Sequence, residues 1–247
     1  MKEDEYEIMY RLEDRHWWFE AKRNYVKRIL DHHLGGNKVR ILDLGCGTGR
    51  MLELLERYGQ AVGMDTHDRA CRFACQRIGP LIVRGDANRL PFKPRSFELV
   101  SAFDLLYHQG ILDDAQVIRQ VYDLLSVGGY FLVTDSAFEF LKSRHDLAVM
   151  ARHRYTIGEL VKKMEKNRFD ILRKTYLYGL TFPLVAGFRL WDKLALRWGR
   201  GEIRSDLKET GPRLNRLLVW ALSWEAKLTD RMNIPFGSSL MILGRKS

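Results

Sequence analysis

The chain has 247 residues and a net charge of +10, and 46% of its residues are hydrophobic. This length suits one large domain or two small ones, with ample material for a core. Its apolar runs fall short of the roughly 20 residues that a membrane-spanning helix needs. The opening segment MKEDEYEIMY is acidic and polar, unlike a secretory leader. We therefore expect a globular protein of the cytoplasm.

The distribution of charge gives the C-terminal part a separate character. Residues 1–150 hold 21 Lys and Arg against 22 Asp and Glu, whereas residues 151–247 hold 20 against 9. All the excess positive charge therefore lies in the last two-fifths of the chain. It favours an anionic partner such as a phospholipid surface, a nucleic acid or a phosphorylated substrate, although a merely soluble basic surface would look the same.

The three cysteines do not indicate a metal site. Cys71 and Cys75 lie four residues apart, and the sequence offers no second Cys or His pair to complete a zinc site with them. Cys46 stands by itself in a glycine-rich turn. We interpret all three as reduced thiols.

The pattern along the chain predicts an α/β fold. A helical pattern covers residues 3–34, and HWWFEAKR within it packs three aromatics into one turn. Apolar runs then alternate with helical patterns, which is typical of βαβ units and a parallel sheet. Strands are expected at 39–44, 61–65, 81–84, 97–102, 129–134, 169–177 and 238–244. Helices are expected at 48–57, 68–77, 114–125 and, after a capping box of Thr156 and Glu159, at 157–166.

A segment between the last two strands interrupts this alternation. It contains two stretches with apolar residues at helical spacing, TFPLVAGFRLWDKLALRW and NRLLVWALSWEAKL. Aromatic and basic residues are interleaved there: Phe182, Phe188, Trp191, Trp198, Trp220 and Trp224 with Arg189, Lys193, Arg197, Arg200, Arg213 and Arg216. This composition suits an anionic bilayer surface, an oligomer interface or an ordinary cap. We expect a helical lid at 1–36, a core at 37–178 plus 238–247, and a helical insertion at 179–237.

A glycine-rich turn follows the first strand. ILDLGCGTGR at 41–50 places Gly45, Gly47 and Gly49 where a ligand must approach the backbone closely, outside the carboxyl ends of parallel strands. Asp43 precedes these glycines; a pyrophosphate would not need it, whereas a cationic ligand would favour it. Asp65 ends the second strand, where its carboxylate can accept hydrogen bonds from a ribose diol or cap the next helix.

The order of these residues resembles that of class I S-adenosylmethionine-dependent methyltransferases. Their first motif is an acidic residue, an apolar residue and then GxGxG, here Asp43-Leu44-Gly45-Cys46-Gly47-Thr48-Gly49. GDA at 85–87, LPF at 90–92 and LLSVGG at 124–129 continue the resemblance, with Glu98 and Val127 in place of the usual Asp and Pro. The resemblance implies a Rossmann-like doubly wound seven-stranded sheet with an antiparallel last strand, and S-adenosyl-L-methionine as the cofactor.

The same resemblance distributes the parts of the cofactor. It implies that the turn of Gly45, Cys46 and Gly47 holds the methionine part. Asp86 would bind the adenine amino group, and Ala87 the adenine edge through its backbone. Thr66, next to Asp65, and Phe103, at the end of the fourth strand, complete the predicted cofactor site.

The acceptor side of the site is harder to predict, because methyl transfer mainly needs alignment and the exclusion of water. SAFDLLYHQG, after the fourth strand, brings Asp104, Tyr107 and His108 to the cofactor-facing edge. His108 is the first candidate for a general base, since neutral imidazole accepts a proton near pH 7. Packing at the sheet edge is the alternative for His108. Asp104 is the second catalytic candidate, orienting the cofactor or His108.

Further residues are candidates for binding the methyl acceptor because they lie on the predicted lid or on loops that project toward the site. They are His16, Trp17, Trp18, Arg23, Tyr107, His145, Arg154 and Tyr155. A plain amphipathic helix explains the first four equally well. A solvated, arginine-rich helix face is the alternative for the residues after the fifth strand.

A narrower resemblance sharpens the architecture. HWWFEAKR at 16–23, residues 141–160 and the C-terminal PFGSSLMILGRK are similar to a bacterial and archaeal methyltransferase subgroup that accompanies sugar and lipid modification genes. The sequence predicts a methyltransferase for a small-molecule, sugar or lipid-linked acceptor, with contact to an anionic membrane through 179–237 as one option. An RNA methyltransferase and a non-catalytic docking protein remain alternatives. The acceptor atom and oligomeric state stay open.

Overall fold

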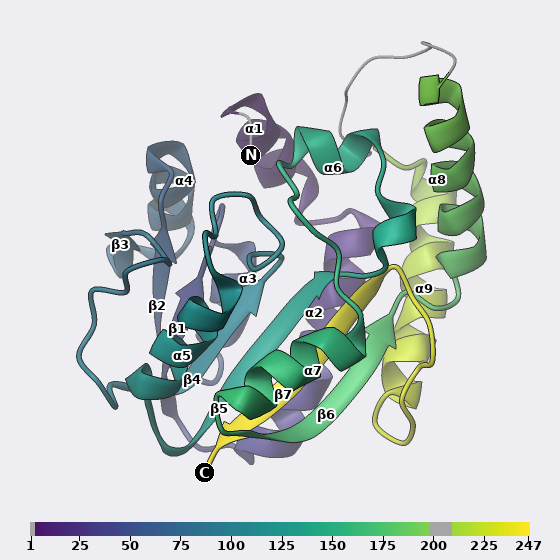
Figure 1. Cartoon of the computed structure of the whole chain (residues 1–247). Coiled ribbons are helices and arrows are strands. Elements are labelled where there is room, and N and C mark those ends of the chain that lie inside the picture. Colours follow the sequence, from purple (N-terminus) through teal and green to yellow (C-terminus); the bar gives the residue numbers. More distant parts are fainter. Residues whose placement is uncertain (1–2, 198–208) are drawn as a thin grey trace.

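The computed structural model describes residues 3–197 and 209–247, and a seven-stranded sheet with helices on both faces forms its centre (Figure 1). The strands run in the order β3-β2-β1-β4-β5-β7-β6. Neighbours among β1 to β5 pair in parallel, whereas β7 is antiparallel to both β5 and β6. This topology confirms the predicted Rossmann-like sheet with an antiparallel last strand. The predicted surface residues Trp198 and Arg200 lie outside the described residues.

The elements lie close to their predicted ranges. The strands are β1 Val39–Leu44, β2 Gly59–Asp65, β3 Ile82–Arg84, β4 Phe97–Phe103, β5 Leu125–Ser136, β6 Phe169–Leu177 and β7 Ser239–Lys246. The helices are α1 Glu3–Leu12, α2 Trp17–Leu34, α3 Arg50–Leu55, α4 Asp68–Ile78, α5 Asp114–Leu124, α6 Arg144–Ala148, α7 Ile157–Lys166, α8 Phe182–Arg197 and α9 Pro212–Leu228, with a short 3-10 helix η1 at Glu139–Leu141. Four buried residues in a row end β1, as expected of a strand covered on both faces.

Two predicted boundaries are wrong. The helical stretch at 3–34 is broken after Leu12, and α2 starts anew because the His16 ring nitrogen Nδ1 accepts a hydrogen bond from the backbone of Trp18. β5 begins at Leu125, directly after α5, instead of at 129. Pairing with β4 skips several residues after Leu125, and Gly128 adopts a φ of 78° within this irregular step.

The insertion supplies α8 and α9, which lie at the right of Figure 1. The two helices differ in position, since α9 packs along α2. Tyr25 on α2 donates to Glu225 on α9 (2.7 Å), and Glu225 in turn accepts from the backbone of Gly179 and Leu180. One buried carboxylate therefore ties α9 both to α2 and to the segment that leads into α8. Within the described residues, no helix has the length and apolar character to cross a bilayer.

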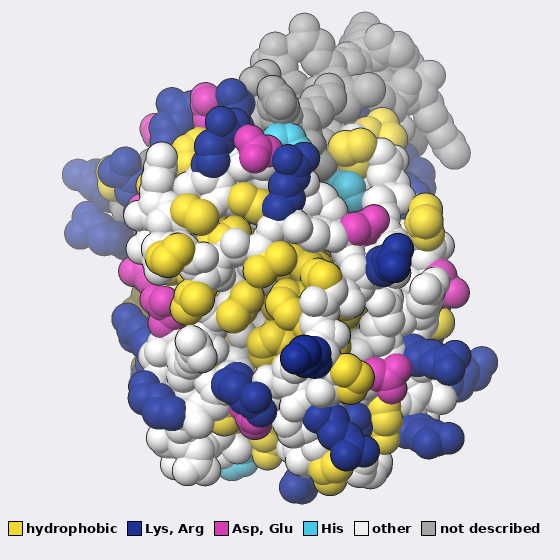
Figure 2. All heavy atoms as spheres, turned by 90° about the vertical axis from the view of Figure 1, so that its left-hand side faces the viewer, with side chains coloured by type: hydrophobic (Ala, Val, Ile, Leu, Met, Phe, Trp, Pro, Cys, Tyr) yellow, Lys and Arg dark blue, Asp and Glu magenta, His cyan; other side chains and the backbone are white. Residues whose placement is uncertain are grey.

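Two apolar clusters cover the two faces of the sheet. One joins β4 and β5 to α5 and α7, and the other joins β1 to α2, α3 and α9. Residues 85–96 connect β3 to β4 without a helix, and Figure 2 shows that side of the molecule, where hydrophobic side chains gather near the centre of the face. Leu90 and Phe92 of this connection are partly buried against the first cluster. These two side chains therefore cover part of the first apolar cluster where no helix does.

Candidate active site

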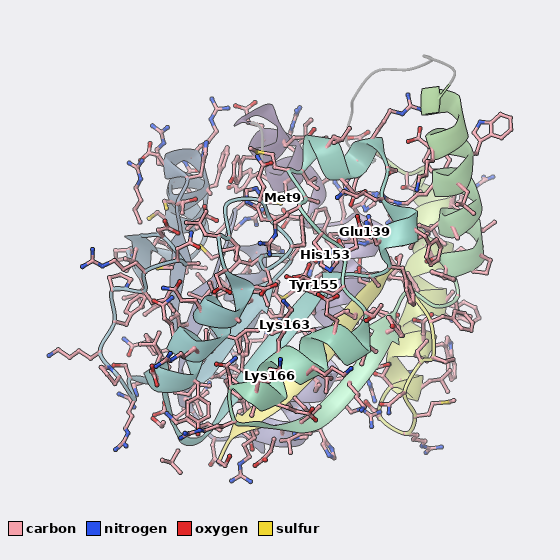
Figure 3. The ribbon with its side chains drawn as sticks, in the orientation of Figure 1. Met9, Glu139, His153, Tyr155, Lys163 and Lys166 are labelled. Atoms are coloured by element: carbon pink, nitrogen blue, oxygen red, sulfur yellow. The ribbon has the colours of Figure 1, made fainter. Side chains whose placement is uncertain are left out.

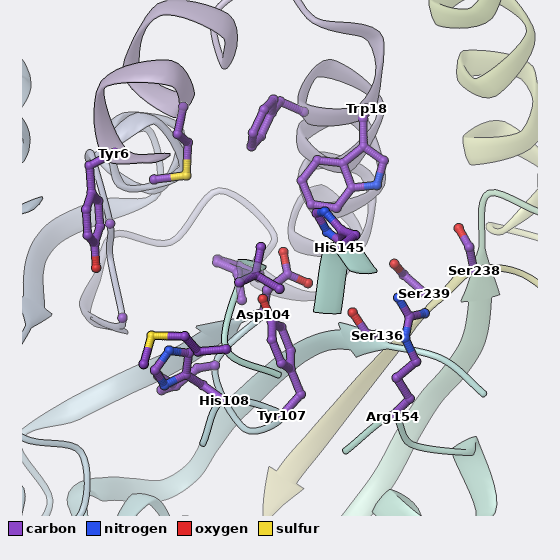
Figure 4. Close-up of a pocket in the computed structure, with 18 of the residues that line it drawn as sticks. Tyr6, Trp18, Asp104, Tyr107, His108, Ser136, His145, Arg154, Ser238 and Ser239 are labelled. Carbon is purple, nitrogen blue, oxygen red and sulfur yellow. The ribbon is translucent and has the colours of Figure 1, made fainter. Parts of the chain in front are cut away.

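A cavity of about 750 Å³ opens at the carboxyl ends of the parallel strands (Figure 4). This volume lies in the range of pockets that hold cofactors and small ligands. Its walls come from the turns after β1, β2, β3 and β4, from α1 and α2, and from α6 and α8. A smaller recess between the glycine turn and α2 adjoins it, and Gly45, Gly47, Trp18 and Asp104 line both.

The glycine turn forms the floor of the cavity. Gly45 and Gly47 have φ values of 70° and 56°, in the left-handed region that favours glycine. A Cβ on Gly47 would lie 3.0 Å from the terminal carbon of Met9 on α1. Cys46 is buried and lines only the smaller recess. The turn therefore keeps its backbone open toward the ligand while α1 lies close above it.

Gly49, the third predicted glycine of the cofactor site, is absent from the walls of both cavities. It precedes α3 with a φ of 87°, and a Cβ there would lie 2.8 Å from the backbone Cα of Ala74 on α4. Gly49 thus lets α3 pack closely on α4. The structure gives it a packing role in place of the predicted ligand contact.

Asp65 lies opposite the glycine turn. Its Oδ2 accepts from the backbone N–H of Gly47 (3.0 Å) and its Oδ1 from that of His67 (2.9 Å), so the carboxylate is held in place by two turns. Burial raises the pKa of Asp65, against the lowering effect of these hydrogen bonds. Each oxygen keeps a lone pair for a ligand hydroxyl. Thr66 lines the cavity beside it, and Tyr6 from α1 stacks on His67.

Asp43 lies fully buried beneath the same turn. The Ser101 hydroxyl donates to it (2.7 Å), and burial raises its pKa to about 7, with the nearby Asp65 adding to the effect. A buried carboxylate with a raised pKa is stabilised in its ionised form by a cation. The floor of the site is therefore complementary to a positively charged ligand.

Asp104 occupies the boundary between the cavity and the recess. Its backbone has a φ of 53°, an uncommon conformation for a residue other than glycine, and its Oδ2 forms an ion pair with Lys22 on α2. The Lys22 ammonium also lies 3.8 Å from the ring centre of Trp18. Among the described atoms, Oδ1 of Asp104 is buried without a hydrogen-bond donor. A ligand N–H or O–H would satisfy it.

His108 and Tyr107 line the cavity on the loop after β4. Nδ1 of His108 accepts from the backbone of Gly110 (3.0 Å), and burial lowers the pKa of His108 to about 4. A proton taken up by His108 would have to reach Nδ1, which is already an acceptor, so this residue is a weak base. Burial raises the pKa of Tyr107, whose phenol therefore stays protonated and can donate. The geometry favours hydrogen-bond donation by Tyr107 over the predicted proton abstraction by His108.

The adenine side of the predicted site is only partly in the cavity. Gly85, Ala87 and Phe103 line it, and Ala87 is buried. Asp86 is exposed outside the lining, and its Oδ1 accepts from both the backbone and the side chain of Asn88. A contact between Asp86 and a base would therefore depend on its other oxygen.

The N-terminal aromatic segment forms one wall. His16, Trp17 and Trp18 line the cavity, and Trp18 stacks on Tyr178 with ring centres 5.9 Å apart. Arg23, in contrast, donates to the backbone oxygens of Glu13 and Asp14 and lines only the smaller recess. The segment therefore combines wall and packing roles, whereas Arg23 fastens the link between α1 and α2.

Two arginines meet one carboxylate at the far end of the cavity. Arg154 holds Asp146 through two hydrogen bonds (2.6 and 3.2 Å), and Arg189 on α8 reaches the same carboxylate (3.0 Å). Both arginines line the cavity, together with His145, whose pKa burial lowers to about 3. Ser136, Ser238 and Ser239 add hydroxyls there (Figure 4). Positive and polar groups thus mark this end.

Tyr155 does not belong to this group. It is buried outside the cavity lining, and its hydroxyl donates to Asp114 (2.5 Å), which also pairs with Lys163 on α7. Figure 3 shows Tyr155 and Lys163 below His153 on this side of the molecule. The structure gives Tyr155 a packing role instead of the predicted acceptor contact.

Comparison with known proteins identifies the segment that carries this floor. Residues 42–133 match the family model described as a methyltransferase domain. They form a class I S-adenosylmethionine-dependent methyltransferase domain. The chain is 28% identical over 204 residues to a probable S-adenosylmethionine-dependent methyltransferase of Mycolicibacterium smegmatis, covering 81% of this chain and 70% of that protein. It is 29% identical over 135 residues to a demethylmenaquinone methyltransferase of Lactiplantibacillus plantarum, covering 50% and 52%.

The fold of this chain is also similar to that of a solved methyltransferase. A solved S-adenosylmethionine-dependent methyltransferase from Thermotoga maritima superposes with a TM-score of 0.59 at 19% identity, covering 99% of this chain and 96% of the other. The chain spans about half the length of the first curated relatives that it matches. These comparisons support the methyltransferase fold and the cofactor, S-adenosyl-L-methionine, but they do not identify the methyl acceptor.

The residues of the methyltransferase domain fit this cofactor. Its sulfonium and ammonium groups are cationic, and both Asp43, which is buried, and Asp104, which is partly exposed, line the recess; the buried Oδ1 of Asp104 has no donor among the described atoms. Asp65 is held in place by the backbone of Gly47 and His67, and its carboxylate could accept hydrogen bonds from a ribose diol. The donor set is therefore that of a ligand with two cationic centres and a diol.

Several residues that line or border the cavity were not predicted from the sequence. Tyr6 and Met9 on α1 and Ser238 before β7 line the cavity, and Lys22 pairs with Asp104. The amphipathic pattern of α1 could have suggested a covering helix, but not which side chains face the ligand. Lys22 sits within HWWFEAKR, and only the packing of α2 brings it to the turn after β4.

Proposed function

We propose that this protein transfers a methyl group from S-adenosyl-L-methionine to a hydrophobic small-molecule or lipid-linked acceptor with a polar or anionic head. One observation carries this proposal: a single cavity joins the cofactor floor to a second half with apolar walls. Trp17, Val185 and Phe188 line that half, and the Arg154–Asp146–Arg189 group lies at its end. The apolar walls suit a hydrophobic body, and the two guanidinium groups suit an anionic head.

The chain's own residues would align the reactants more than activate them. When bound, the cofactor supplies an electrophilic methyl group, which the acceptor atom takes as the carbon–sulfur bond breaks. Asp65 and the Lys22–Asp104 pair would hold the cofactor at both ends. Tyr107 donates a hydrogen bond next to the reacting centre, and Trp17 and Phe188 keep water away from it. With His108 a weak base, the acceptor is best one that needs no strong proton abstraction.

The names of several relatives point to the same chemical class. The chain is similar to proteins named as demethylmenaquinone, sterol 24-C- and fatty-acid O-methyltransferases, whose acceptors are largely apolar molecules. These likenesses cover 50% to 62% of this chain, and the apolar wall formed by α8 supports the same class independently. An RNA acceptor has less support, because the far wall includes aliphatic side chains such as Leu184 and Val185, which give a base no ring to stack on.

Calorimetry with the purified protein tests the cofactor half. Asp65→Ala should weaken S-adenosylmethionine binding by roughly tenfold to a hundredfold, since hydrogen bonds to a charged group contribute about 1.5–3 kcal/mol. Asp170→Ala, at an exposed position of β6, is the matched control and should bind like the unchanged chain. Equal affinity in the two variants would contradict the site assignment.

Release of S-adenosylhomocysteine tests the acceptor half. The protein is incubated with cofactor and with solvent-extracted lipids, aqueous small molecules or RNA, and the methylated fraction is identified by mass. Methylation confined to the lipid extract supports the proposal. Methylation of RNA, or none in any fraction by a protein that binds the cofactor, would contradict it and favour the RNA or docking alternative.

A further inference from the structure

α9 exposes an apolar stripe on the face opposite its packed side. Leu214, Leu217, Trp220, Trp224 and Leu228 follow one another three or four residues apart, so they lie on one face of the helix. All five are exposed, with Trp220 at 61%. The packed face is separate and consists of Leu222, Glu225 and Ala226. The helix therefore has one apolar face that holds it to α2 and another that nothing in the described chain covers.

α8 repeats this arrangement at the border of the cavity. Leu184, Phe188 and Trp191 lie four and three residues apart, and Leu184 is 76% exposed. Leu184 and Phe188 also line the cavity. The wall of the acceptor half is therefore continuous with an exposed apolar helix face. Through Glu225, the start of α8 is tied to α9.

The charges of the two helices are sorted between inside and outside. Of the acidic residues in the described parts of 179–237, Asp192 and Glu225 are buried and Asp230 pairs with Arg28, which leaves Glu209. Basic residues take the exposed positions: Lys193, Arg213, Arg216, Lys227 and Arg231. The apolar stripes therefore lie in a positively charged surface.

We propose that α8 and α9 form a docking surface for an anionic phospholipid bilayer. Tryptophans and leucines on a helix face enter the boundary between headgroups and acyl chains, while neighbouring Lys and Arg contact lipid phosphates. Docking does not depend on methyl transfer. The consequence that a hydrophobic acceptor enters from the bilayer past Leu184 and Phe188 rests on the proposed function. The positive charge beside the stripe favours this partner over a second copy of the chain, whose equally basic surface would be repelled.

Co-sedimentation of the full chain with vesicles tests the docking. Vesicles of phosphatidylcholine alone are compared with vesicles that contain about 30% phosphatidylglycerol, at low and high salt. Binding is expected only with the anionic vesicles and should weaken at high salt. Arg213→Gln/Arg216→Gln should weaken it by about tenfold or more, whereas Lys162→Gln/Lys166→Gln, exposed on α7, should not.

The apolar stripe is tested by Trp220→Ser/Trp224→Ser, which should lose most of the vesicle binding. Leu112→Ser/Val127→Ser removes two apolar side chains elsewhere that are even more exposed than the tryptophans, and this variant should bind normally. Cofactor affinity by calorimetry, unchanged in every variant, shows that each one is folded and separates this test from that of the proposed function. The proposal is overturned if the chain binds neutral and anionic vesicles equally well, or if the tryptophan variant binds as well as the unchanged chain. A dimer in ultracentrifugation that the tryptophan variant converts to a monomer also overturns it, since a second copy would then occupy the surface.

Discussion

In the cofactor half of the cavity, the binding groups belong to backbone turns at the ends of neighbouring strands; Gly47 and Asp65, bonded to each other, are 18 residues apart. In the acceptor half, the walls are side chains on helices, and contacts such as that of Tyr178 with the backbone of Trp18 span 160 residues. A turn of this kind is specified by a few positions, each of which requires one particular residue type, such as glycine where φ is positive. A side-chain wall tolerates many residue types, provided that the packing brings them together.

Glycine substitutions should break this comparison most visibly. Gly49→Ala, with its positive φ and its approach of 2.8 Å to Ala74, should destabilise the fold by about 2–4 kcal/mol. Gly187→Ala, in α8 with nothing within 4 Å, should stabilise it by up to about 1 kcal/mol through helix propensity. Urea unfolding measures both. Equal destabilisation would show that the insertion is as constrained as the turn.

The pH dependence of cofactor binding should sharpen the role of the floor. The pKa of Asp43, raised to about 7 by burial, leaves its carboxylate ionised above pH 7 and neutral below it. S-adenosylmethionine, a cation, should therefore bind more weakly as pH falls from 8 to 6, by at most about tenfold per unit. S-adenosylhomocysteine, with its neutral sulfur, should respond less. Asp43→Asn should remove the difference; equal slopes for the two ligands in the unchanged chain would contradict this account.

Substitutions in the wall of the acceptor half should change the KM for the acceptor and leave cofactor binding unchanged. Trp17→Ala removes a large aromatic surface from the cavity and should raise the KM for the acceptor by about fivefold to twentyfold. Trp17→Phe should retain most of the affinity. S-adenosylmethionine binding, measured by calorimetry, should be unchanged in both variants. A parallel loss of cofactor affinity would mean that Trp17 belongs to the cofactor half.

The smallest effect is expected at α1. Burial raises the pKa of Glu13 to about 7, above its ordinary 4.5, although its bonds to Thr48 and Arg77 act in the opposite direction. The stability that its neutral form provides is present below about pH 4.5 and is lost as pH rises through 7. The protection of α1 amides from exchange, taken relative to the intrinsic exchange rate at each pH, should be about twofold to threefold lower at pH 8 than at pH 6. Glu13→Gln should remove this difference, and an unchanged ratio in the variant would exclude Glu13 as its source.

Much of the fold and of the cofactor site could be predicted. The strands have buried apolar runs between turn residues, and the antiparallel last strand follows the family resemblance. The turn with Gly45 and Gly47 and the carboxylate of Asp65 lie where the sequence placed them. Gly49 and Tyr155, which the sequence placed in the site, lie outside the cavity walls. A glycine needed for helix packing and a tyrosine bonded to a buried Asp have the same local sequence pattern as ligand contacts.

The sequence by itself determined the order of the strands along the chain, the open glycine turn and the acidic floor, because each depends on residues close together in the sequence. Only the tertiary structure decided that α8 borders the cavity while α9 packs on α2, and that Lys22 and Arg189 face the site. Those positions result from side chains packing across long sequence separations. The basic, tryptophan-rich insertion was visible in the sequence from the start, but only folding buried Asp192 and Glu225 and left the basic side chains and the apolar stripes of α8 and α9 at the surface.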